Sequence, residues 1–388
     1  MIFILLGITL AIFAIKYIDY RPIINQKPLI LILLLLIAIP AIRFRVGGDT
    51  LIYMDEYGDM PNLKQLNVYL SDYSGRYQYL WILFVAFLKT ITPEFILLQI
   101  VLSIIINCSF FYAIKRETRY VFVALFLYFI HTYFYLNFEA LRESLAICVF
   151  ILFGLPYIRK KQWIQYVVSV IVAYLFHDSA MILMLLPFLY NKKMNSKWVL
   201  ILCFFIGFLI TIYGNLDPYL RMLKPNSISD ERMFYIDKMN LFNINYIITK
   251  LGYRVILPMV VFFVCQKNNI KTTIDGFIIF YLMIGIISAC LPAFGRLSDY
   301  QLFFSIVYFA EILGQSRKPI KTVISFPKPL ILIVFLAIFY VRMLTGMFAS
   351  TENDVKGTHY YNLYVPYVTV FNPEYYPPRE ILNTEIRN

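Results

Sequence analysis

The sequence predicts an all-α, polytopic integral membrane protein with about twelve transmembrane helices. Of its 388 residues, 60% are hydrophobic and only 15% are charged, and the mean hydropathy of +0.69 exceeds that of ordinary soluble domains. Because about 20 apolar residues cross a membrane as a helix, this length suits roughly a dozen crossings. A soluble enzyme, a disordered tail protein and a disulfide-stapled secreted domain are therefore excluded.

Thirteen apolar stretches supply the candidate helices. The stretch 77–88 holds only twelve residues between Arg76 and Lys89, which is short for a crossing. If it lies flat in the outer interface as an interfacial helix, every basic connector falls on one side, as the positive-inside rule requires. The N-terminal stretch lacks a preceding basic region, so we expect a retained first helix rather than a signal peptide. The stretches lie near residues 2–15, 28–42, 77–88, 94–114, 120–136, 138–155, 163–176, 179–190, 197–213, 246–265, 274–291, 297–314 and 329–347.

The net charge of +12 indicates how the helices are oriented. Six predicted cytoplasmic connectors carry 18 Lys/Arg against three acidic residues, an excess of +15, and the rest of the chain balances to −3. Both termini are then expected outside. The basic residues are scattered between apolar runs, so topology explains them better than nucleic-acid binding does. The connectors are 16–27, 115–119, 156–162, 191–197, 266–275 and 315–328.

We expect a single transmembrane domain at 1–347 and an outer Tyr- and Pro-rich tail at 348–388. The domain carries long outer loops at 43–93 and 214–245, and long loops are often functional. The tail suits a segment folded over the membrane surface or a platform that stacks on sugars. The five cysteines lie in or at the ends of apolar runs, and the acidic residues form no D-x-D motif, so we expect no disulfide, metal or cofactor.

Arginine is enriched on the outer side, where topology requires no positive charge. Eleven of the 17 outer basic residues are arginine, against five of the 18 inner ones. A guanidinium binds phosphate or carboxylate oxygens through two N–H groups, so this enrichment favours a polyanionic ligand, with pairing to outer acidic residues as the alternative. Arg254 lies about eight residues inside an apolar stretch, where its charge is costly unless it faces a polar cavity.

Two outer helix junctions carry further charged residues. Glu139, Arg142 and Glu143 lie at i, i+3 and i+4 on one helix face, either as a self-paired group or as part of a site. Arg296 follows Pro292 at another outer turn, which would place it near the same cavity. We therefore expect a charged site on the outer side of the helices.

His177 and Asp49 are the candidates for a general base. His177 begins a His-Asp-Ser sequence between two apolar runs, where structural and functional roles are both open and Asp178 or Ser179 suits a helix cap. Asp49 follows two arginines and a Gly-Gly pair that permits a tight turn. It is either an ordinary helix cap or a carboxylate able to deprotonate a sugar hydroxyl.

Four pieces of sequence occur in a fixed order over about residues 40–305. They are Arg43-Phe-Arg-x-Gly-Gly-Asp49-x-x-x-Tyr53, Asn137-Phe-x-x-Leu-Arg142-x-Ser-x-Ala, Leu175-Phe-His177-x-Ser-Ala and Arg296-Leu-Ser-x-Tyr300. On a background of twelve helices this pattern resembles the EpsG-type branch of the Wzy-like bacterial polysaccharide polymerases. The family commonly has Gln at the position of Glu143, and Glu-Pro after the basic residue that corresponds to Arg76, so the chain departs from the pattern at both places.

The resemblance implies a membrane glycosyltransferase on the outer face of the bacterial inner membrane, similar in architecture to lipid-linked glycosyltransferases of the GT-C type. It would join undecaprenyl-diphosphate-linked oligosaccharide repeat units, which serve as donor and acceptor, into an O-antigen or exopolysaccharide. Membrane lipid and a chain-length regulator protein are the other partners we expect. A lipid-linked glycan flippase or transporter and an O-antigen ligase-type glycosyltransferase are the alternatives.

For that reaction we expect His177 or Asp49 to be the base and arginines to stabilise the diphosphate leaving group without a metal. Arg142, Arg254 and Arg296 are assigned to the diphosphate, and Arg43 and Arg45 to the sugar or to the entrance of the site. The full set of diphosphate- or sugar-binding candidates is Arg43, Arg45, Arg76, Arg142, Glu143, Arg232, Arg254, Arg296, Tyr53 and Tyr300.

Overall fold

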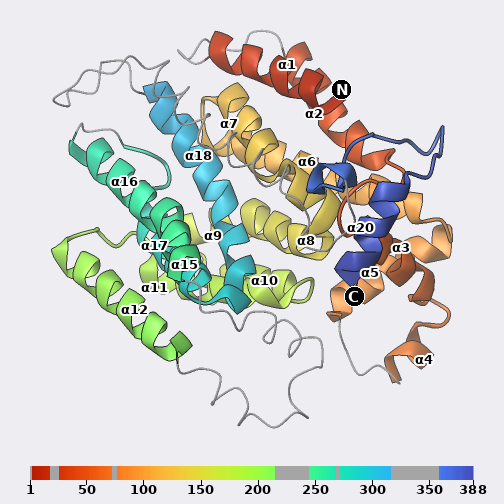
Figure 1. The fold of residues 1–388 in the computed structure, drawn as a ribbon. Coiled ribbons are helices and arrows are strands. Elements are labelled where there is room, and N and C mark those ends of the chain that lie inside the picture. Colours follow the sequence, from red (N-terminus) through yellow and green to blue (C-terminus); the bar gives the residue numbers. More distant parts are fainter. Residues whose placement is uncertain are drawn as a thin grey trace. The chain divides into compact units, whose positions relative to one another are not determined.

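The protein is helical throughout the residues that the computed structural model describes (Figure 1). These residues are 2–17, 26–71, 77–214, 244–267, 271–315 and 358–387. Within them there is no named strand, and the only β-type pairs are two isolated bridges made by Thr369, to Arg43 and to Asn372. The predicted all-α class is therefore confirmed for this part of the chain. Arg76, Arg232, the apolar stretch 329–347 and most of the loop 214–245 lie outside the described residues.

The chain divides into two compact units, which are treated separately below. One unit contains residues 1–181 and 309–388, and the other contains residues 182–308. The described part of the predicted tail belongs to the first unit. The boundary predicted at residue 347 stays a prediction.

Apolar helices pack in pairs in the first unit (Figure 1). α2 packs against α6, and α1 packs against α7. The chain then breaks into π-helical turns, resumes at α8, breaks again at η3 and continues to α10. The elements are α1 (Ile2–Lys16), α2 (Lys27–Ala41), α3 (Thr50–Asp59), α4 (Leu66–Ser71), α5 (Tyr79–Ile91), α6 (Phe95–Glu117), α7 (Val121–Tyr128), η1 (Phe129–Tyr133), η2 (Tyr135–Glu139), α8 (Leu141–Val149), η3 (Phe150–Gly154), α9 (Leu155–Arg159) and α10 (Trp163–Tyr174).

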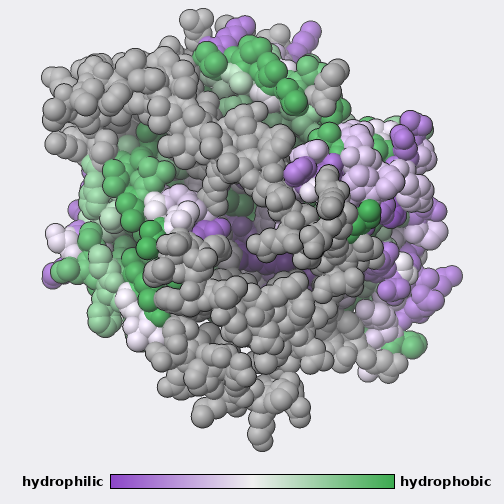
Figure 2. All heavy atoms as spheres, viewed as in Figure 1, coloured by the Kyte–Doolittle hydropathy of each residue, from purple (hydrophilic) through white to green (hydrophobic). Residues whose placement is uncertain are grey.

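The helices of the first unit present an aliphatic surface that suits lipid. α1 exposes a row of large aliphatic side chains, among them Ile4, Leu5, Ile8 and Ile12. Figure 2 shows this apolar surface over α1, whereas the surface over α3 and α4 is mostly hydrophilic. A contiguous exposed apolar face of this kind is typical of a membrane-contacting helix.

By helix length, fewer membrane-crossing helices can be assigned than the sequence predicts. In the described ranges, two helical segments are long and apolar enough to cross a membrane, Phe95–Glu117 and Leu141–Arg159. Eight other apolar helical segments have 10–17 residues. The predicted helices are thus present at their expected places within these ranges, and the number of twelve crossings stays a prediction.

A buried amide network fixes the chain just before α8. The Asn107 side-chain amide donates to Asn137 Oδ1 at 2.7 Å, and the Tyr128 hydroxyl donates to Asn107 Oδ1 at 3.0 Å. Asn137 in turn donates to the Tyr133 carbonyl at 2.9 Å. Buried amides are costly unless they are paired, so this network favours one path for the chain. Asn137, part of the second sequence piece, therefore has a structural role.

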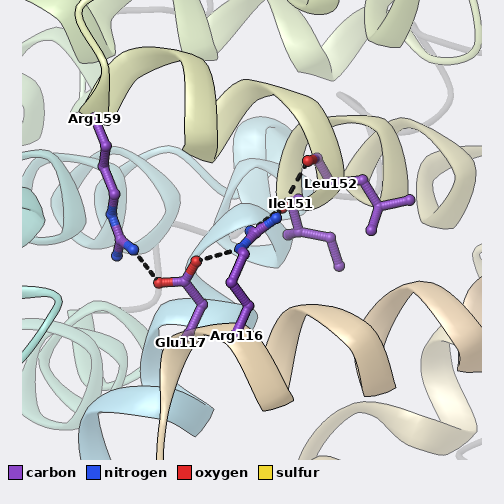
Figure 3. A network of polar contacts seen from close by, with 5 residues as sticks. All are labelled: Arg116, Glu117, Ile151, Leu152 and Arg159. Atoms are coloured by element: carbon purple, nitrogen blue, oxygen red, sulfur yellow. Dashed lines mark hydrogen bonds and ion pairs between the residues drawn. The ribbon is translucent and has the colours of Figure 1, made fainter.

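An ion-pair network joins the ends of α6 and α9 (Figure 3). The buried Glu117 carboxylate accepts a 2.8 Å hydrogen bond from Arg116 Nε and also contacts the Arg159 guanidinium. Arg116 donates further hydrogen bonds to the carbonyls of Ile151 at 2.6 Å and Leu152 at 3.3 Å. Both carbonyls lie in the π-helical turn η3, where the helical hydrogen-bond ladder is disturbed. Two predicted cytoplasmic connectors are thus tied together by their charges.

The described tail packs against the loop that follows α2. Gly47 N–H donates to the Leu363 carbonyl at 2.9 Å, and Phe44 N–H donates to the Val368 carbonyl at 2.9 Å. The Tyr364 hydroxyl, 225 positions away in sequence, donates to the Glu139 carboxylate. The tail includes η9 (Tyr360–Leu363) and ends in α20 (Pro377–Arg387). Its aromatic residues therefore serve, at least in part, to dock the tail on the protein itself.

The second unit is built around α17. This buried helix packs against α12, α15, η6 and η8. At Gly285 a Cβ atom would lie 2.8 Å from the Arg254 carbonyl, so glycine permits η6 to approach α17 closely. The elements are η4 (Asp178–Leu185), which begins in the first unit, α11 (Leu186–Leu189), α12 (Ser196–Gly214), α15 (Ile244–Leu251), η6 (Gly252–Ile256), α16 (Leu257–Lys267), η7 (Asp275–Phe277), α17 (Ile278–Cys290), η8 (Pro292–Ser298) and α18 (Asp299–Gln315), which continues into the first unit.

Candidate functional site

His177 lies in the turn between α10 and η4 and is 7% exposed. Its Nδ1 atom is 2.7 Å from Ser179 Oγ and 3.5 Å from Asp178 Oδ1. The backbone N–H of Ser179 also points to Nδ1, at 3.3 Å. The Nδ1 side of the imidazole is therefore occupied by its own turn.

Glu143 meets this turn from the first turn of α8. The Ser179 hydroxyl is 3.0 Å from Glu143 Oε1, and the Tyr135 hydroxyl is 3.5 Å from Glu143 Oε2. Glu143 is only 1% exposed. Two of the predicted site residues, Glu143 and His177, are thus brought together through a serine that sequence reasoning treated as a helix cap.

The break before α8 places Arg142 and Glu143. Ala140 has φ −96° and ψ 51°, which interrupts the helix between η2 and α8. The Ser144 hydroxyl lies within hydrogen-bond distance of the carbonyls of Leu136 and Ala140, both at 2.8 Å, and so covers carbonyls at the interruption. Because the helix restarts here, both side chains lie at a helix beginning instead of within a continuous apolar helix.

Arg142 lies among aromatic residues from α3, from α5 and from the segment just before α5. Its guanidinium carbon is 4.8 Å from the centre of the Tyr77 ring, and its charge interacts with the Tyr53 hydroxyl. Tyr53 packs edge-on against Trp81 with ring centres 6.2 Å apart. Arg142 Nε and Trp81 Nε1 are buried donors that have no hydrogen-bond partner in the described part of the chain. Within the described residues, two buried donors in this neighbourhood thus have unused hydrogen-bonding capacity.

A backbone hydrogen bond ties this aromatic group to the histidine turn. Leu80 N–H, in the first turn of α5, donates to the Leu175 carbonyl at 3.0 Å, two residues before His177. In addition, Phe84 packs edge-on against Phe176 with ring centres 6.5 Å apart. The start of α5, the end of α10 and the start of α8 therefore converge in the first unit.

Asp49 occupies the N-cap position of α3, but its side chain makes no capping hydrogen bond. The glycines before it allow close contact with η2. A Cβ at Gly47, which has φ +120°, would lie 3.0 Å from Phe138 Cβ, and a Cβ at Gly48 would lie 3.2 Å from Glu139 Oε1. The Gly-Gly pair thus has the role in close approach that its sequence suggested, and Asp49 is not an ordinary cap.

Glu139 is a second carboxylate near Asp49. It lies between the apolar segments Val121–Tyr133 and Leu141–Arg159, where the tail contacts it through Tyr364. Burial raises the pKa of Glu139, the Tyr364 hydrogen bond lowers it and the charge of Asp49 raises it, and the net result is a pKa of about 7. Glu139 can therefore change its protonation state near neutral pH.

Arg43 is almost fully buried, at 2% exposed. It donates from Nη1 to the Pro40 carbonyl at 2.7 Å, and its guanidinium lies 4.8 Å from the centre of the Phe138 ring. Its Nε and Nη2 have no hydrogen-bond partner in the described part of the chain. Burial lowers its pKa to about 10, with tyrosine hydroxyls from the tail partly opposing the shift. The side chain therefore remains positively charged at neutral pH.

Arg45 is paired with the tail. It has the unusual positive φ of 57°, its Nε donates to Glu380 Oε1 at 2.8 Å, and its guanidinium lies 5.1 Å from the centre of the Tyr375 ring. The hydrogen bond to Glu380 raises the pKa of Arg45. Arg45 thus pairs with an acidic residue, which is the alternative to ligand binding that the sequence left open for the outer arginines. The assignment of Arg43 and Arg45 to substrate stays a prediction.

Three predicted site residues lie in the second unit. Arg254, in η6, donates to Ser288 Oγ at 3.0 Å and to the Ser288 carbonyl at 3.2 Å. Arg296 is exposed in η8, and Tyr300 is buried at 1% exposed in α18. The predicted meeting of Arg254 and Arg296 with Arg142 stays a prediction, because these residues belong to different units.

Sequence reasoning missed several residues of this neighbourhood. Ser179 looked like a helix cap, although its position two residues after His177 was a usable signal. Tyr77 and Trp81 were counted only as part of an apolar stretch. Within the described ranges, no group of three or more His, Cys, Asp or Glu side chains could hold a metal ion.

The fold and the site define a helical membrane protein that carries a buried polar cluster where three helices end or begin. A family model described as the EpsG family matches residues 27–368, which is most of the chain, so the chain belongs to the EpsG family. The resemblance found in the sequence is thereby confirmed, and this membership indicates a polysaccharide polymerase of the glycosyltransferase type. No curated protein and no solved structure matches the chain.

Proposed function

We propose that this protein joins undecaprenyl-diphosphate-linked oligosaccharide repeat units into a polysaccharide on the outer face of the bacterial inner membrane. Donor and acceptor are both lipid-linked, and transfer occurs in one displacement without a metal. The observation that carries the proposal is the convergence of Arg142, Glu143 and His177 in a chain of the EpsG family. A cation, a carboxylate and an imidazole are the groups that such a transfer requires.

The proposed reaction forms one glycosidic bond and breaks one bond to phosphate. The acceptor hydroxyl oxygen attacks the anomeric carbon of the donor, and its proton passes to His177 or Asp49. The bond between that carbon and the diphosphate oxygen breaks, and undecaprenyl diphosphate leaves with the electron pair. A cation fixed in place before the reaction stabilises the charge that develops on the leaving oxygen.

Arg142 is the first choice for the diphosphate. Its Nε donor is buried and unpartnered in the described part of the chain, so a phosphate oxygen there replaces no existing hydrogen bond. The Trp81 Nε1 donor and the Tyr53 and Tyr77 rings suit a sugar, because aromatic faces stack on sugar C–H groups and buried donors bind hydroxyls. From the sequence, Arg254 and Arg296 are also proposed to bind the diphosphate.

The remaining features of the proposal concern topology and partners. Twelve crossings, a GT-C-like architecture and an active site that faces the periplasm or outside fit the charge asymmetry of +15 against −3. A chain-length regulator protein is a further proposed partner.

The experiment that tests this function uses purified full-length protein in liposomes and one synthetic undecaprenyl-diphosphate-linked repeat unit. A ladder of products, separated by one repeat unit each, is the expected result. His177→Ala should abolish the ladder, whereas the control Lys160→Ala, at an exposed residue outside the site, should retain it. Wild-type protein that yields no covalent product contradicts the proposal.

The same experiment separates the two alternatives. A ligase transfers one glycan to a different acceptor and gives no ladder from the repeat unit alone. A flippase or transporter moves the lipid-linked unit between leaflets and forms no covalent product. A membrane-impermeant sugar-oxidising reagent detects this movement, because it reacts only with units in the exposed leaflet. Charged residues throughout the depth of the bundle would favour the transporter.

A further inference from the structure

We propose that Glu143 and Ser179 are positioning residues that hold His177 in the tautomer with an unprotonated Nε2. This proposal deepens the proposed function, because it rests on His177 being the base that accepts the proton of the acceptor hydroxyl. It makes Glu143, whose role the sequence left open, part of the proton-transfer machinery without contact to substrate.

The three side chains form a continuous chain of short contacts. Ser179 Oγ lies 2.7 Å from His177 Nδ1 and 3.0 Å from Glu143 Oε1. His177 and Glu143 are 7% and 1% exposed, so the chain is largely shielded from water. The serine thus bridges the imidazole of His177 and the carboxylate of Glu143.

Counting protons gives the direction of the hydrogen bonds. An ionised carboxylate only accepts, so the single hydroxyl proton of Ser179 goes to Glu143. Ser179 Oγ must then accept from His177, which places the ring proton on Nδ1 and leaves the lone pair on Nε2. A neutral Glu143 permits the reverse chain, in which it donates to Ser179 and Ser179 donates to Nδ1. The ionisation of Glu143 therefore selects the tautomer.

A second donor competes for Nδ1. The backbone N–H of Ser179 lies 3.3 Å from Nδ1 and favours the opposite tautomer, with the proton on Nε2. The contact through Oγ is shorter, at 2.7 Å, and it ends on a charged acceptor, so it is the stronger of the two. Removal of the hydroxyl deletes the 2.7 Å contact and leaves the backbone donor at 3.3 Å and the more distant Asp178 carboxylate at 3.5 Å, so the tautomer should reverse.

The hydrogen-bond chain from His177 to Glu143 also affects the positive charge that forms on the imidazole during transfer. When Nε2 takes the acceptor proton, the imidazolium is stabilised through Ser179 by Glu143 and directly by Asp178, 3.5 Å from Nδ1. Among the described residues, the other titratable or charged groups near this turn include Tyr135, which contacts Glu143, and Arg142, which stands over the ring of Tyr77 just before α5. The negative charge of Glu143 therefore favours the protonated histidine and keeps the acidic limit of activity at a higher pH.

Substitutions at Glu143 and Ser179 separate positioning from simple packing. Ser179→Ala should lower kcat by roughly 10- to 100-fold with little change in KM, and Ser179→Thr should restore most of the rate. Glu143→Gln still accepts from Ser179 but lacks the charge, so the acidic limb of the pH–rate profile should move down by roughly one pH unit. Ser169→Ala is the matched control, because that buried hydroxyl bonds only to the nearby Tyr166 carbonyl in these contacts.

The deciding measurement needs no activity. The chain has three histidines, so ¹⁵N NMR of histidine-labelled protein, with His177→Gln for assignment, reports the tautomer directly. We expect a protonated Nδ1 and a bare Nε2 in the wild type, and the reverse in Ser179→Ala. A protonated Nε2 in the wild type, or no change in Ser179→Ala, overturns the proposal. If the wild type shows the expected tautomer but makes no polymer, the proposed function fails and the positioning chain stands.

Discussion

Arg45 Nε lies 2.8 Å from Glu380 Oε1, and the two residues are 335 positions apart in sequence. Their side chains are 21% and 26% exposed, so the pair is partly shielded from water. It holds α20 against the loop between α2 and α3, which also carries Asp49. The tail is thus a structural partner of the segment that contains a candidate base.

Breaking this pair should loosen the tail. Arg45→Ala and Glu380→Ala should each increase the rate of proteolysis in residues 358–387, and a double-mutant cycle should give a coupling of about 1 kcal/mol, as for a partly exposed pair. Glu374→Ala, at an exposed acidic residue of the same tail, is the control. Equal cleavage of the wild type and all variants would show that the pair does not hold the tail.

Replacement of Gly47 tests the close approach of the loop to η2. Gly47→Ala should destabilise the protein by about 2 kcal/mol, because φ +120° is strained for alanine and the new Cβ would meet Thr50 Oγ1 at 2.6 Å. Gly58→Ala is the matched control, since a Cβ there has no neighbour within 4 Å. Thermal unfolding in detergent gives the melting temperatures of both variants. An equal melting temperature for Gly47→Ala and the wild type would contradict the role of this turn.

The ion-pair network of Figure 3 should contribute to stability. Glu117→Ala leaves the guanidinium groups of Arg116 and Arg159 without their shared carboxylate, at a cost of about 3 kcal/mol. Lys160→Ala, at an exposed residue of the connector that carries Arg159, should change stability by less than about 0.5 kcal/mol. Chemical unfolding followed by tryptophan fluorescence compares the two. If Glu117→Ala is as stable as Lys160→Ala, the ion-pair network does not contribute to stability.

The raised pKa of Glu139 predicts a pH-dependent stability. Because its pKa rises from 4.5 to about 7 on folding, the folded state favours the protonated carboxyl. The stabilisation is complete below pH 4.5 and is lost as the pH rises through 7. Melting temperatures measured between pH 5 and 8 should therefore fall by a few degrees in the wild type and by less in Glu139→Gln. The same decline in both proteins would assign the effect to other groups.

The positions of the helices could be predicted from apolar runs, but their interruptions could not. The stretches 94–114 and 138–155 correspond to α6 and to the segment Leu141–Arg159. The π-helical turns between Phe129 and Glu139 follow from the contacts of Asn107, Tyr128 and Asn137, which come from separate helices. Hydrophobic periodicity carries no information about such buried amide contacts.

The sequence predicted several residues of the site, but it did not predict the contacts between them. Arg142, Glu143 and His177 were singled out because polar residues at helix junctions are costly without a role. The bridging role of Ser179 depends on which face of α8 meets the histidine turn, and only the packed helices determine that. Likewise, the partner of Arg45 could not be chosen from the sequence, because many outer acids were available.

The products of a single turnover test whether this protein joins repeat units with His177 as the base. Wild-type protein in liposomes, given the lipid-linked repeat unit, should release one undecaprenyl diphosphate for each glycosidic bond formed, as measured by mass spectrometry. His177→Ala should form neither product, although it folds and binds the lipid-linked unit. Carrier release without a new glycosidic bond, or wild-type bond formation by His177→Ala, would contradict the account.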